Sequence, residues 1–401
     1  MKGGEFFRLK PFDLIEIHPD SEIFLLPCRA PVGYDPSAGK YVKINEKGYL
    51  AVSAFPAPGR TTTYSASYSE RGRVRILPLF SYAAVAFYRG KFYVAATCVD
   101  RERRQSLKGM DISLVEKGVK DLRKVFPKNR LVRHLEGCAL NYGCPAAKNF
   151  FLKRYEGPLP TSPSCNAVCL GCISKQPRKS CSVTQPRITF IPTAEEIAEV
   201  ALFHIKNVAD PVVSFGQGCE GEPLMVGKVL VEAVRMIRKS TSKGMVNLNT
   251  NASKPEVIRE LFDAGLDSIR VSTNSLREKY YNVYYKPRGY TFSDVKKSIR
   301  YAKKANGFVS LNYLVMPGFT DLLKETEALE KFIEKNKVDM IQWRNLNYDP
   351  KKYFKKIKYT PKSERIVGVK ELIEIIGKKY PRVMCGYFNP SKLRIKRFRS
   401  K

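Results

Sequence analysis

Residues 165–172 read CNAVCLGC, and the interpretation of the whole chain starts from this short stretch. Its three cysteines, Cys165, Cys169 and Cys172, are separated by three and by two residues, and none of the eight side chains is charged. A segment of this composition can curl into a loop that points three sulfur atoms at one centre. Three converging thiolates suit a soft metal centre, either a zinc ion or an iron–sulfur cluster.

Strand-like and helix-like patterns alternate after this loop, from residue 186 onward. We expect strands at residues 212–215, 245–249, 268–273, 309–316 and 339–343. We expect helices at residues 194–206, 226–239, 255–264, 293–304, 322–335 and 363–379, two of which begin with a capping-box pattern, Thr193 with Glu196 and Ser253 with Glu256. Parallel strands joined by crossover helices produce such alternation. With one strand before the cysteines, the pattern predicts an α/β fold with a partial (β/α)6 TIM-like barrel as its core.

In barrels of this kind, the loops that follow the strands build the active site. The second expected strand leads into residues 216–224, GQGCEGEPL, where glycines allow close backbone approach and Glu222 offers a carboxylate. Polar side chains lie at the ends of later strands, namely Asn251, Ser272, Asn274 and Arg344. Asn and Ser are equally common as helix caps and turn residues, and an arginine at a strand end can form a surface ion pair.

The cysteine spacing, together with the Gly-Glu-Pro-Leu segment about fifty residues later, resembles the radical SAM superfamily. The resemblance implies that Cys165, Cys169 and Cys172 hold three irons of a 4Fe–4S cluster, whose open fourth iron binds S-adenosylmethionine (SAM). It also implies that Gly221 and Glu222 bind the methionyl ammonium of SAM. By the same resemblance, Asn251, Ser272 and Asn274 would contact the SAM ribose and carboxylate, and Arg344 the SAM carboxylate or the substrate.

In this superfamily, one-electron reduction of the cluster cleaves SAM and yields a 5′-deoxyadenosyl radical, which abstracts a hydrogen atom from the substrate. A one-electron donor such as flavodoxin or ferredoxin is therefore an expected partner. The sequence departs from the family pattern at two positions, since Glu220 replaces a glycine and Gly171 stands where an aromatic residue is frequent. The Pro-rich residues 157–164, GPLPTSPS, do not resemble a regular first strand.

Residues 1–150 are predicted to form a β-rich N-terminal domain of unknown role. We expect strands at residues 13–18, 22–28, 49–54, 74–79, 82–88 and 92–98, a loop at 57–72, a helix at 114–126 and a connection at 127–164. Residues 151–360 would then form the barrel, and residues 361–401 a C-terminal helix and a basic tail.

The net charge of +33 is unevenly distributed along the chain. Residues 351–401 carry 17 Lys/Arg and 3 Asp/Glu, and residues 51–150 carry 18 and 7. Concentrated positive charge favours a polyanionic partner, and we expect nucleic acid, with residues 391–401 gripping phosphates. A solvated basic surface without a nucleic-acid partner is the alternative.

The other cysteines leave several possibilities open. A zinc site at the three-cysteine loop would need a fourth ligand, for which Cys181 is available. Cys28, Cys98, Cys138 and Cys144 could supply a second cluster or be ordinary buried thiols. Cys219, beside Glu222, could donate a hydrogen atom or carry a methyl group.

The leading functional interpretation is a radical SAM enzyme that acts on an unknown substrate, with RNA preferred. One alternative is a radical SAM enzyme that acts on a protein or a small metabolite, and another is a zinc-stabilised RNA-binding protein without catalysis. The sequence shows no apolar run of membrane-spanning length and no signal-peptide pattern, so we expect a cytoplasmic protein that does not engage a membrane. The substrate, the fate of SAM and the oligomeric state are left open.

Overall fold

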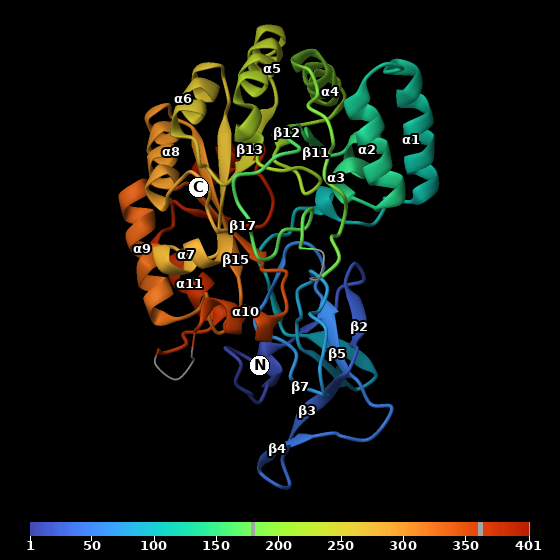
Figure 1. The fold of residues 1–401 in the computed structure, drawn as a ribbon, viewed down its shortest axis with the longest axis vertical. Helices are drawn as coiled ribbons and strands as arrows, with labels where there is room; N and C mark the ends of the chain where they lie inside the picture. The colour runs from blue at the N-terminus through green and yellow to red at the C-terminus, as the bar shows by residue number, and fades with distance from the viewer. Residues whose placement is uncertain (178–180, 360–363, 401) are drawn as a thin grey trace.

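A seven-stranded parallel sheet forms the centre of the computed structural model, which describes residues 1–177, 181–359 and 364–400. The strands lie in the sheet in their order along the chain. They are β11 (Glu156–Pro158), β12 (Val212–Phe215), β13 (Met245–Thr250), β14 (Ser268–Thr273), β15 (Phe308–Val315), β16 (Met340–Asn345) and β17 (Met384–Gly386). The sheet curls into a partial barrel (Figure 1). The predicted partial TIM-like core is confirmed, with one strand more than the six expected.

Helices between the strands cover the outer face of the sheet (Figure 1). They are α4 (Ala194–Asn207), α5 (Gly227–Ser240), α6 (Pro255–Asp263), α8 (Phe292–Lys304), α9 (Leu323–Asn336) and α11 (Val369–Lys379). Helix α11 was expected to start at residue 363, which lies outside the described residues, and it starts instead at Val369. Two short helices that the sequence patterns missed follow strand ends, α7 (Glu278–Tyr285) and α10 (Pro350–Ile357).

The two expected capping boxes have different outcomes. Thr193 and Glu196 form a reciprocal box at the start of α4, as predicted. The box predicted at Ser253 is wrong, because α6 begins after Lys254 without a side-chain cap. The Ser253 hydroxyl instead accepts a hydrogen bond from Asn166 in the cysteine loop.

The floor of the barrel, at the N-terminal ends of the strands, is apolar. Six of the seven strands contribute one buried apolar side chain at or just before their first residue, whereas β14 begins with Ser268. The six are Tyr155, Val212, Met245, Phe308, Met340 and Met384. Ile395 and Phe398 of the last helix, α12 (Lys392–Arg399), pack against this layer from below. The apolar floor therefore excludes water from the lower end of the lumen.

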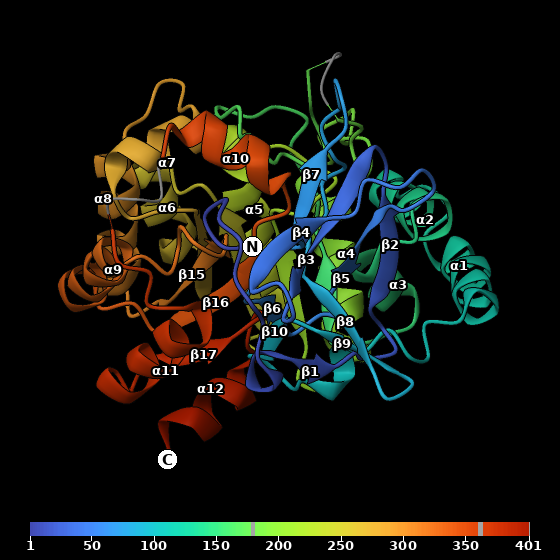
Figure 2. The same cartoon turned by 90° about the horizontal axis from the view of Figure 1, so that it is seen from below.

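The C-terminal segment closes the open side of the partial barrel. The side chain of Asn389 donates a hydrogen bond to Glu156 of β11 and accepts one from Gln342 of β16. The hydroxyl of Tyr155, just before β11, donates to the backbone oxygen of Asn389. Figure 2 shows α12 next to β17 and α11. Residues 361–401, expected to form only a helix and a tail, thus add a strand and the closing contacts.

The N-terminal part contains small antiparallel sheets with the strand orders β1-β9-β8, β2-β5, β4-β3-β7 and β10-β6. Their strands are β1 (Ile15–Glu16), β2 (Glu22–Leu26), β3 (Arg29–Asp35), β4 (Lys40–Lys43), β5 (Ala51–Phe55), β6 (Arg60–Thr62), β7 (Tyr68–Glu70), β8 (Val85–Tyr88), β9 (Lys91–Val94) and β10 (Ala96–Cys98). The loop predicted at residues 57–72 is wrong, since β6 and β7 lie there. The strand predicted at 74–79 is not formed, and the β3–β4 hairpin was missed.

Three helices connect these sheets to the barrel: α1 (Ile112–Val125), α2 (Arg130–Asn141) and α3 (Pro145–Phe151). The helix predicted at 114–126 is confirmed as α1, but residues 127–164 are not the plain connection that we expected. Val115, Leu131 and Phe150 belong to the same buried cluster as the barrel strands. Short 3-10 helices occur at Pro11–Asp13, Arg103–Gln105 and Pro223–Val226.

Strand β6 packs beside β16 and ties the N-terminal sheets to the barrel (Figure 2). The Thr61 hydroxyl donates to the backbone oxygen of Trp343 at 2.6 Å. Near the end of β16, the carboxylate of Asp349 forms a fully buried ion pair with Arg29. None of the described helices has both the length and the apolar character that a membrane crossing requires.

Candidate active site

The three-cysteine loop lies between β11 and α4 and is held by the backbone of α7. The backbone N–H of Val168 donates to the oxygen of Tyr285 at 2.9 Å, and that of Leu170 to the oxygen of Tyr284 at 3.0 Å. Both tyrosines are buried. Helix α7, which the sequence analysis missed, therefore fixes the path of the loop.

Gly171 leaves space that Tyr284 fills. A Cβ atom at position 171 would lie 2.8 Å from the Tyr284 hydroxyl oxygen and 3.2 Å from the backbone oxygen of Asn347. An aromatic residue at this position would collide with both. The aromatic cover that Gly171 lacks is thus provided by a residue from α7.

The thiols of the loop are in an environment that disfavours uncompensated thiolates. Burial, followed by the nearby Glu222 carboxylate, raises the pKa of Cys165 to about 11. Burial and the charges of the other two thiolates hold the pKa of Cys169 well above its usual range. Three partly buried sulfurs that would repel one another as anions suit a cationic centre between them.

The spacing of these sulfurs distinguishes the two kinds of metal centre. In the described part of the chain, the three sulfurs of this loop do not all lie within 4.8 Å of one another. Zn–S bonds of about 2.3 Å in a tetrahedral site would hold them about 3.8 Å apart. A 4Fe–4S cluster would bind each thiolate through a different iron, so it would accept three sulfur atoms that lie further apart than at a zinc ion. The residues present therefore fit a 4Fe–4S cluster better than a zinc ion.

Arg187 is a cation beside these sulfurs that the sequence analysis did not identify. Its guanidinium donates to the sulfur of Cys172 at 3.6 Å, to the hydroxyl of Ser174 and to the backbone oxygen of Pro163. Only its proximity in the folded chain reveals it, since no motif surrounds it.

Glu220 anchors the loop that follows β12. One carboxylate oxygen accepts hydrogen bonds from the backbone N–H groups of Gly216 and Gln217, and the other accepts from those of Thr161 and Ser162. The side chain is buried. Glu220 therefore shapes the loop rather than offering a free carboxylate to a ligand.

Gly221 and Glu222 dock directly against the residues that precede Cys165. Their backbone N–H groups donate to the backbone oxygens of Ser162 at 2.6 Å and Ser164 at 2.8 Å. A Cβ atom at position 221 would lie 1.9 Å from the Ser164 oxygen, so only glycine permits this approach. The two loops of the predicted site therefore form one unit.

The Glu222 carboxylate is buried and receives only neutral hydrogen-bond donors. They are the Thr250 hydroxyl and the backbone N–H groups of Asn251 and Leu224. Burial raises the pKa of this carboxyl to about 7. A bound ammonium would supply the missing positive charge, which fits the role expected for this residue.

Asn251 connects the same two loops. Its side-chain amide donates to the Asn166 side chain at 2.8 Å, while its backbone N–H donates to Glu222. Asn251 thus lies with the cysteine loop and the Glu222 loop.

The remaining predicted residues lie further along the sheet. Ser272 faces the lumen from β14, where its hydroxyl accepts from Asn312 of β15 at 3.3 Å. Asn274 is fully buried, and its amide donates to the Tyr353 hydroxyl of α10, so it is not grouped with Ser272. Arg344 of β16 stacks on the Tyr387 ring with its guanidinium carbon 4.0 Å from the ring centroid.

Arg270 of β14 is a second arginine in the lumen that the sequence analysis missed. Burial and the nearby charge of Arg344 lower its pKa to about 10. One guanidinium nitrogen donates to Gln342 at 3.3 Å, while its buried Nε has no hydrogen-bond partner in the described part of the chain. The alternation in β14, where Ser268, Arg270 and Ser272 share one face, was the available signal.

The comparison with protein families identifies the middle of the chain. Residues 159–333 match the model of the radical SAM superfamily. The chain carries a radical SAM domain. The match begins directly after β11, includes both loops of the site and ends within α9. The superfamily implies a 4Fe–4S cluster and SAM as cofactors.

Several solved structures of radical SAM enzymes are similar to this chain. A radical SAM methyltransferase from Sphaerobacter thermophilus shares 13% identity with a TM-score of 0.38, over 51% of this chain and 63% of its own. The FeFe-hydrogenase maturase HydG from Carboxydothermus hydrogenoformans shares 12% sequence identity with a TM-score of 0.38, and the match covers 68% of this chain and 69% of HydG. Methylornithine synthase shares 16% sequence identity with a TM-score of 0.38, and the match covers 67% of this chain and 77% of the synthase. This chain spans less than two thirds of the methyltransferase. No curated protein matches the sequence.

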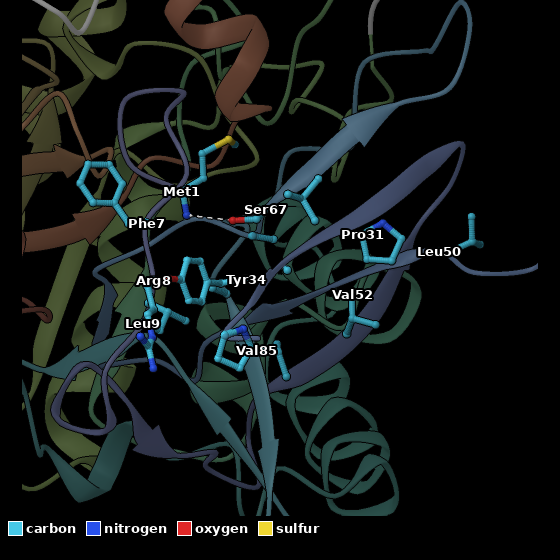
Figure 3. Close-up of a pocket in the computed structure, with 15 residues that line it drawn as sticks. Met1, Phe7, Arg8, Leu9, Pro31, Tyr34, Leu50, Val52, Ser67 and Val85 are labelled. Carbon is cyan, nitrogen blue, oxygen red and sulfur yellow. Dashed lines mark hydrogen bonds between the residues drawn. The ribbon is translucent and has the colours of Figure 1, made fainter. Parts of the chain in front are cut away.

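A cavity of about 590 Å³ lies in the N-terminal part, away from the two loops of the radical SAM domain (Figure 3). Its lining is mainly apolar and includes Phe7, Pro31, Tyr34 and Val52. The amino group of Met1 donates to the Ser65 backbone oxygen and the Ser67 hydroxyl at its edge. Burial lowers the pKa of this amino group to about 5. None of the predicted site residues lines this cavity.

Proposed function

We propose that this protein is a radical SAM enzyme in which Cys165, Cys169 and Cys172 bind a 4Fe–4S cluster and the Gly221–Glu222 loop binds SAM. The observation that carries the proposal is the direct backbone pairing of the Gly221–Glu222 loop with Ser162 and Ser164, just before Cys165. This pairing would hold a ligand of the Glu222 carboxylate next to the sulfurs.

When bound and reduced by one electron, the cluster would supply the electron that cleaves SAM to a 5′-deoxyadenosyl radical. The protein's own groups position the ligand. Glu222 would hold the methionyl ammonium, Asn251 would keep the two loops in register, and Tyr284 would shield the site from water. An external donor such as flavodoxin or ferredoxin would deliver the electron. Free thiols and a reducible cluster suit the reducing conditions of the cytoplasm.

Arg270 and Arg344 would hold an anionic group in the lumen. Both side chains are half-buried, the charge of Arg344 contributes to lowering the pKa of Arg270, and the Nε of Arg270 has no hydrogen-bond partner among the described residues. SAM offers a carboxylate, and a substrate could offer a carboxylate or a phosphate. Either anion would relieve the repulsion between the two guanidinium groups.

The test is anaerobic purification followed by reduction in the presence of SAM. We expect a brown protein with about four irons per chain that releases 5′-deoxyadenosine. The Cys169→Ala variant should lose both the iron and the release of 5′-deoxyadenosine. The Cys28→Ser variant, which changes an exposed thiol, should keep both. Colourless wild-type protein, or 5′-deoxyadenosine formation by Cys169→Ala, would refute the assignment.

Nucleic acid is the substrate class that we propose next, because the fold brings the two most basic segments together. A groove of about 470 Å³ contains five arginines and three carboxylates in its lining, namely Arg101, Arg103, Arg104, Arg394, Arg397, Asp100, Glu102 and Asp210. Other basic residues of α12 are already used, since Lys392, Arg394 and Arg399 pair with Asp267, Asp100 and Asp339. Only part of the basic tail therefore remains available for phosphates.

Binding of bulk tRNA at increasing salt concentration tests this substrate class. We expect steep salt dependence that is reduced in the triple variant with Arg101, Arg103 and Arg397 changed to Gln. In the matched control, three lysines on the exposed side of α1 are changed to Gln, namely Lys117, Lys120 and Lys124. Equal weakening by both variants would mean non-specific attraction, and absence of binding would favour a protein or small-metabolite substrate.

A further inference from the structure

A second group of metal-ligating side chains lies behind the Glu222 loop. His134 and Cys138 are one turn apart on α2, and Cys219 belongs to the loop after β12. One ligand atom from each lies within 4.8 Å of the other two. Both cysteines are buried, and His134 is partly buried. Three residues from two distant segments thus converge on one point.

The dimensions of this group suit a single metal ion. The Nε2 of His134 lies 3.5 Å from the sulfur of Cys138. A tetrahedral zinc with Zn–N of about 2.0 Å and Zn–S of about 2.3 Å holds nitrogen and sulfur about 3.5 Å apart. The compact spacing contrasts with that of Cys165, Cys169 and Cys172, which do not meet the same limit. The two sets therefore suit different centres, one mononuclear and one a cluster.

Cys144 is a further cysteine beside this group, although it is not one of the residues whose ligand atoms all lie within 4.8 Å of one another. It follows α2 and caps α3, and its backbone N–H donates to the backbone oxygen of Cys138 at 3.0 Å. Its thiol is close enough to Cys138 that the charge of Cys138 adds to burial in raising the pKa of Cys144. One histidine and three cysteines form a common ligand set of structural zinc sites.

We propose that His134, Cys138 and Cys219 bind a structural zinc ion that fastens helix α2 to the SAM-binding loop, and that Cys144 moves in as the fourth ligand when the ion binds. Cys219 lies three residues before Glu222, and Glu220 between them already anchors the loop. Zinc would add a cross-link between this loop and the helices that precede the radical SAM domain. The site does not depend on the proposed function, because its ligands are distinct from those of the cluster.

Metal analysis of the full-length protein, purified anaerobically, tests the proposal. We expect roughly one zinc per chain in addition to the cluster iron. Cys138→Ser and Cys219→Ser should lose zinc but keep iron, whereas Cys169→Ala should lose iron but keep zinc. Cys28→Ser, which changes an exposed thiol, should keep both. Loss of zinc in Cys169→Ala alone would place zinc at the other cysteines and overturn the proposal.

X-ray absorption at the zinc edge of the wild-type protein keeps the test valid if a variant does not fold. We expect three sulfurs at about 2.3 Å and one nitrogen at about 2.0 Å. Cobalt-substituted protein should show the thiolate charge-transfer bands of a tetrahedral site. A folded wild-type protein without zinc, or with a Cys138–Cys219 disulfide in its mass spectrum, would overturn the proposal.

Discussion

Gly171 and Tyr284 share one small volume beside the cysteine loop. The glycine belongs to the loop, and the tyrosine reaches the same space from α7. Because Tyr284 is almost completely buried, it has little room to move away from an added side chain.

Gly171→Ala should destabilise the protein by about 1–3 kcal/mol, since the new methyl group meets both Tyr284 and the Asn347 backbone. Combining it with Tyr284→Phe, which removes the contacting oxygen, should recover part of this loss. Urea unfolding of the wild type, both single variants and the double variant gives the coupling free energy. Strictly additive effects would show that the two residues do not share this space.

Arg270→Gln should weaken anion binding in the lumen by roughly 10- to 100-fold, because a charge-assisted hydrogen bond is lost. Iron content should be unchanged, since the variant does not touch the cysteine loop. Equilibrium binding of SAM, and the thermal stabilisation by phosphate relative to chloride, are the two measurements. Weaker SAM binding would assign the pair to the SAM carboxylate.

A loss of phosphate stabilisation alone would assign Arg270 and Arg344 to a substrate anion. Unchanged values for both ligands would contradict any anion-binding role. Arg259→Gln, which removes an exposed arginine on α6, is the matched control.

At the scale of elements, helix α4 carries a buried ionisable group. His204 stacks on Phe150 of α3, its Nε2 lies 3.4 Å from the Tyr155 oxygen, and its Nδ1 has no hydrogen-bond partner among the residues that the structure describes. Burial lowers its pKa to about 4. The unfolded chain binds a proton near the ordinary value of about 6.5. The contribution of neutral His204 to stability is therefore complete above pH 6.5 and is lost as the pH falls toward 4.

Between pH 7 and pH 5, this residue should cost the folded state about 2 kcal/mol. His204→Phe retains a ring without a titrating group, so its stability should fall less over the same range. Urea midpoints at the two pH values provide the comparison. If the urea midpoint of His204→Phe falls between pH 7 and pH 5 by as much as that of the wild type, the acid sensitivity belongs to other groups.

The helices and strands also show which parts of the fold could be predicted from the sequence. The strands and outer helices of the barrel follow hydrophobic periodicity, because each buries one defined face, and so they were predicted closely. Residues 57–72 are rich in Ser, Thr and Tyr and were expected to form a loop. They form β6, which hydrogen-bonds to β16 and pairs with β10, and β7, which pairs with β3, because these tertiary contacts outweigh local composition. In α7, the spacing of Tyr281, Tyr284 and Tyr285 fits one helical face, a signal that was present but not used.

The residues of the candidate site also fall into two groups, those indicated by a local motif and those brought there only by the packing of distant segments. Motif spacing indicated Cys165, Cys169, Cys172, Gly221, Glu222 and Asn251, which contact one another or lie on loops that do. Arg187, Arg270 and Tyr284 belong to no motif. They reach the site only through the packing of distant segments, which a single sequence does not display.

At the scale of the whole molecule, the last helix supports the barrel from below. Ile395 is buried in the apolar floor, whereas its neighbour Lys396 is exposed. Ile395→Ala should destabilise the protein by about 2 kcal/mol or more, and Lys396→Ala should have little effect. Thermal and urea unfolding provide the measurement. Equal stability of the two variants would show that α12 is only loosely attached.

The same closure has a consequence for biosynthesis. Residues 384–399 follow all other parts of the barrel in the order of translation, so Tyr155, Phe308 and Met340 stay uncovered until these residues leave the ribosome. During this interval the nascent chain exposes an apolar surface to chaperones and to other unfinished chains. Slow translation of the preceding codons would prolong that exposure, and the timing of synthesis would then determine how much of the protein reaches its closed form.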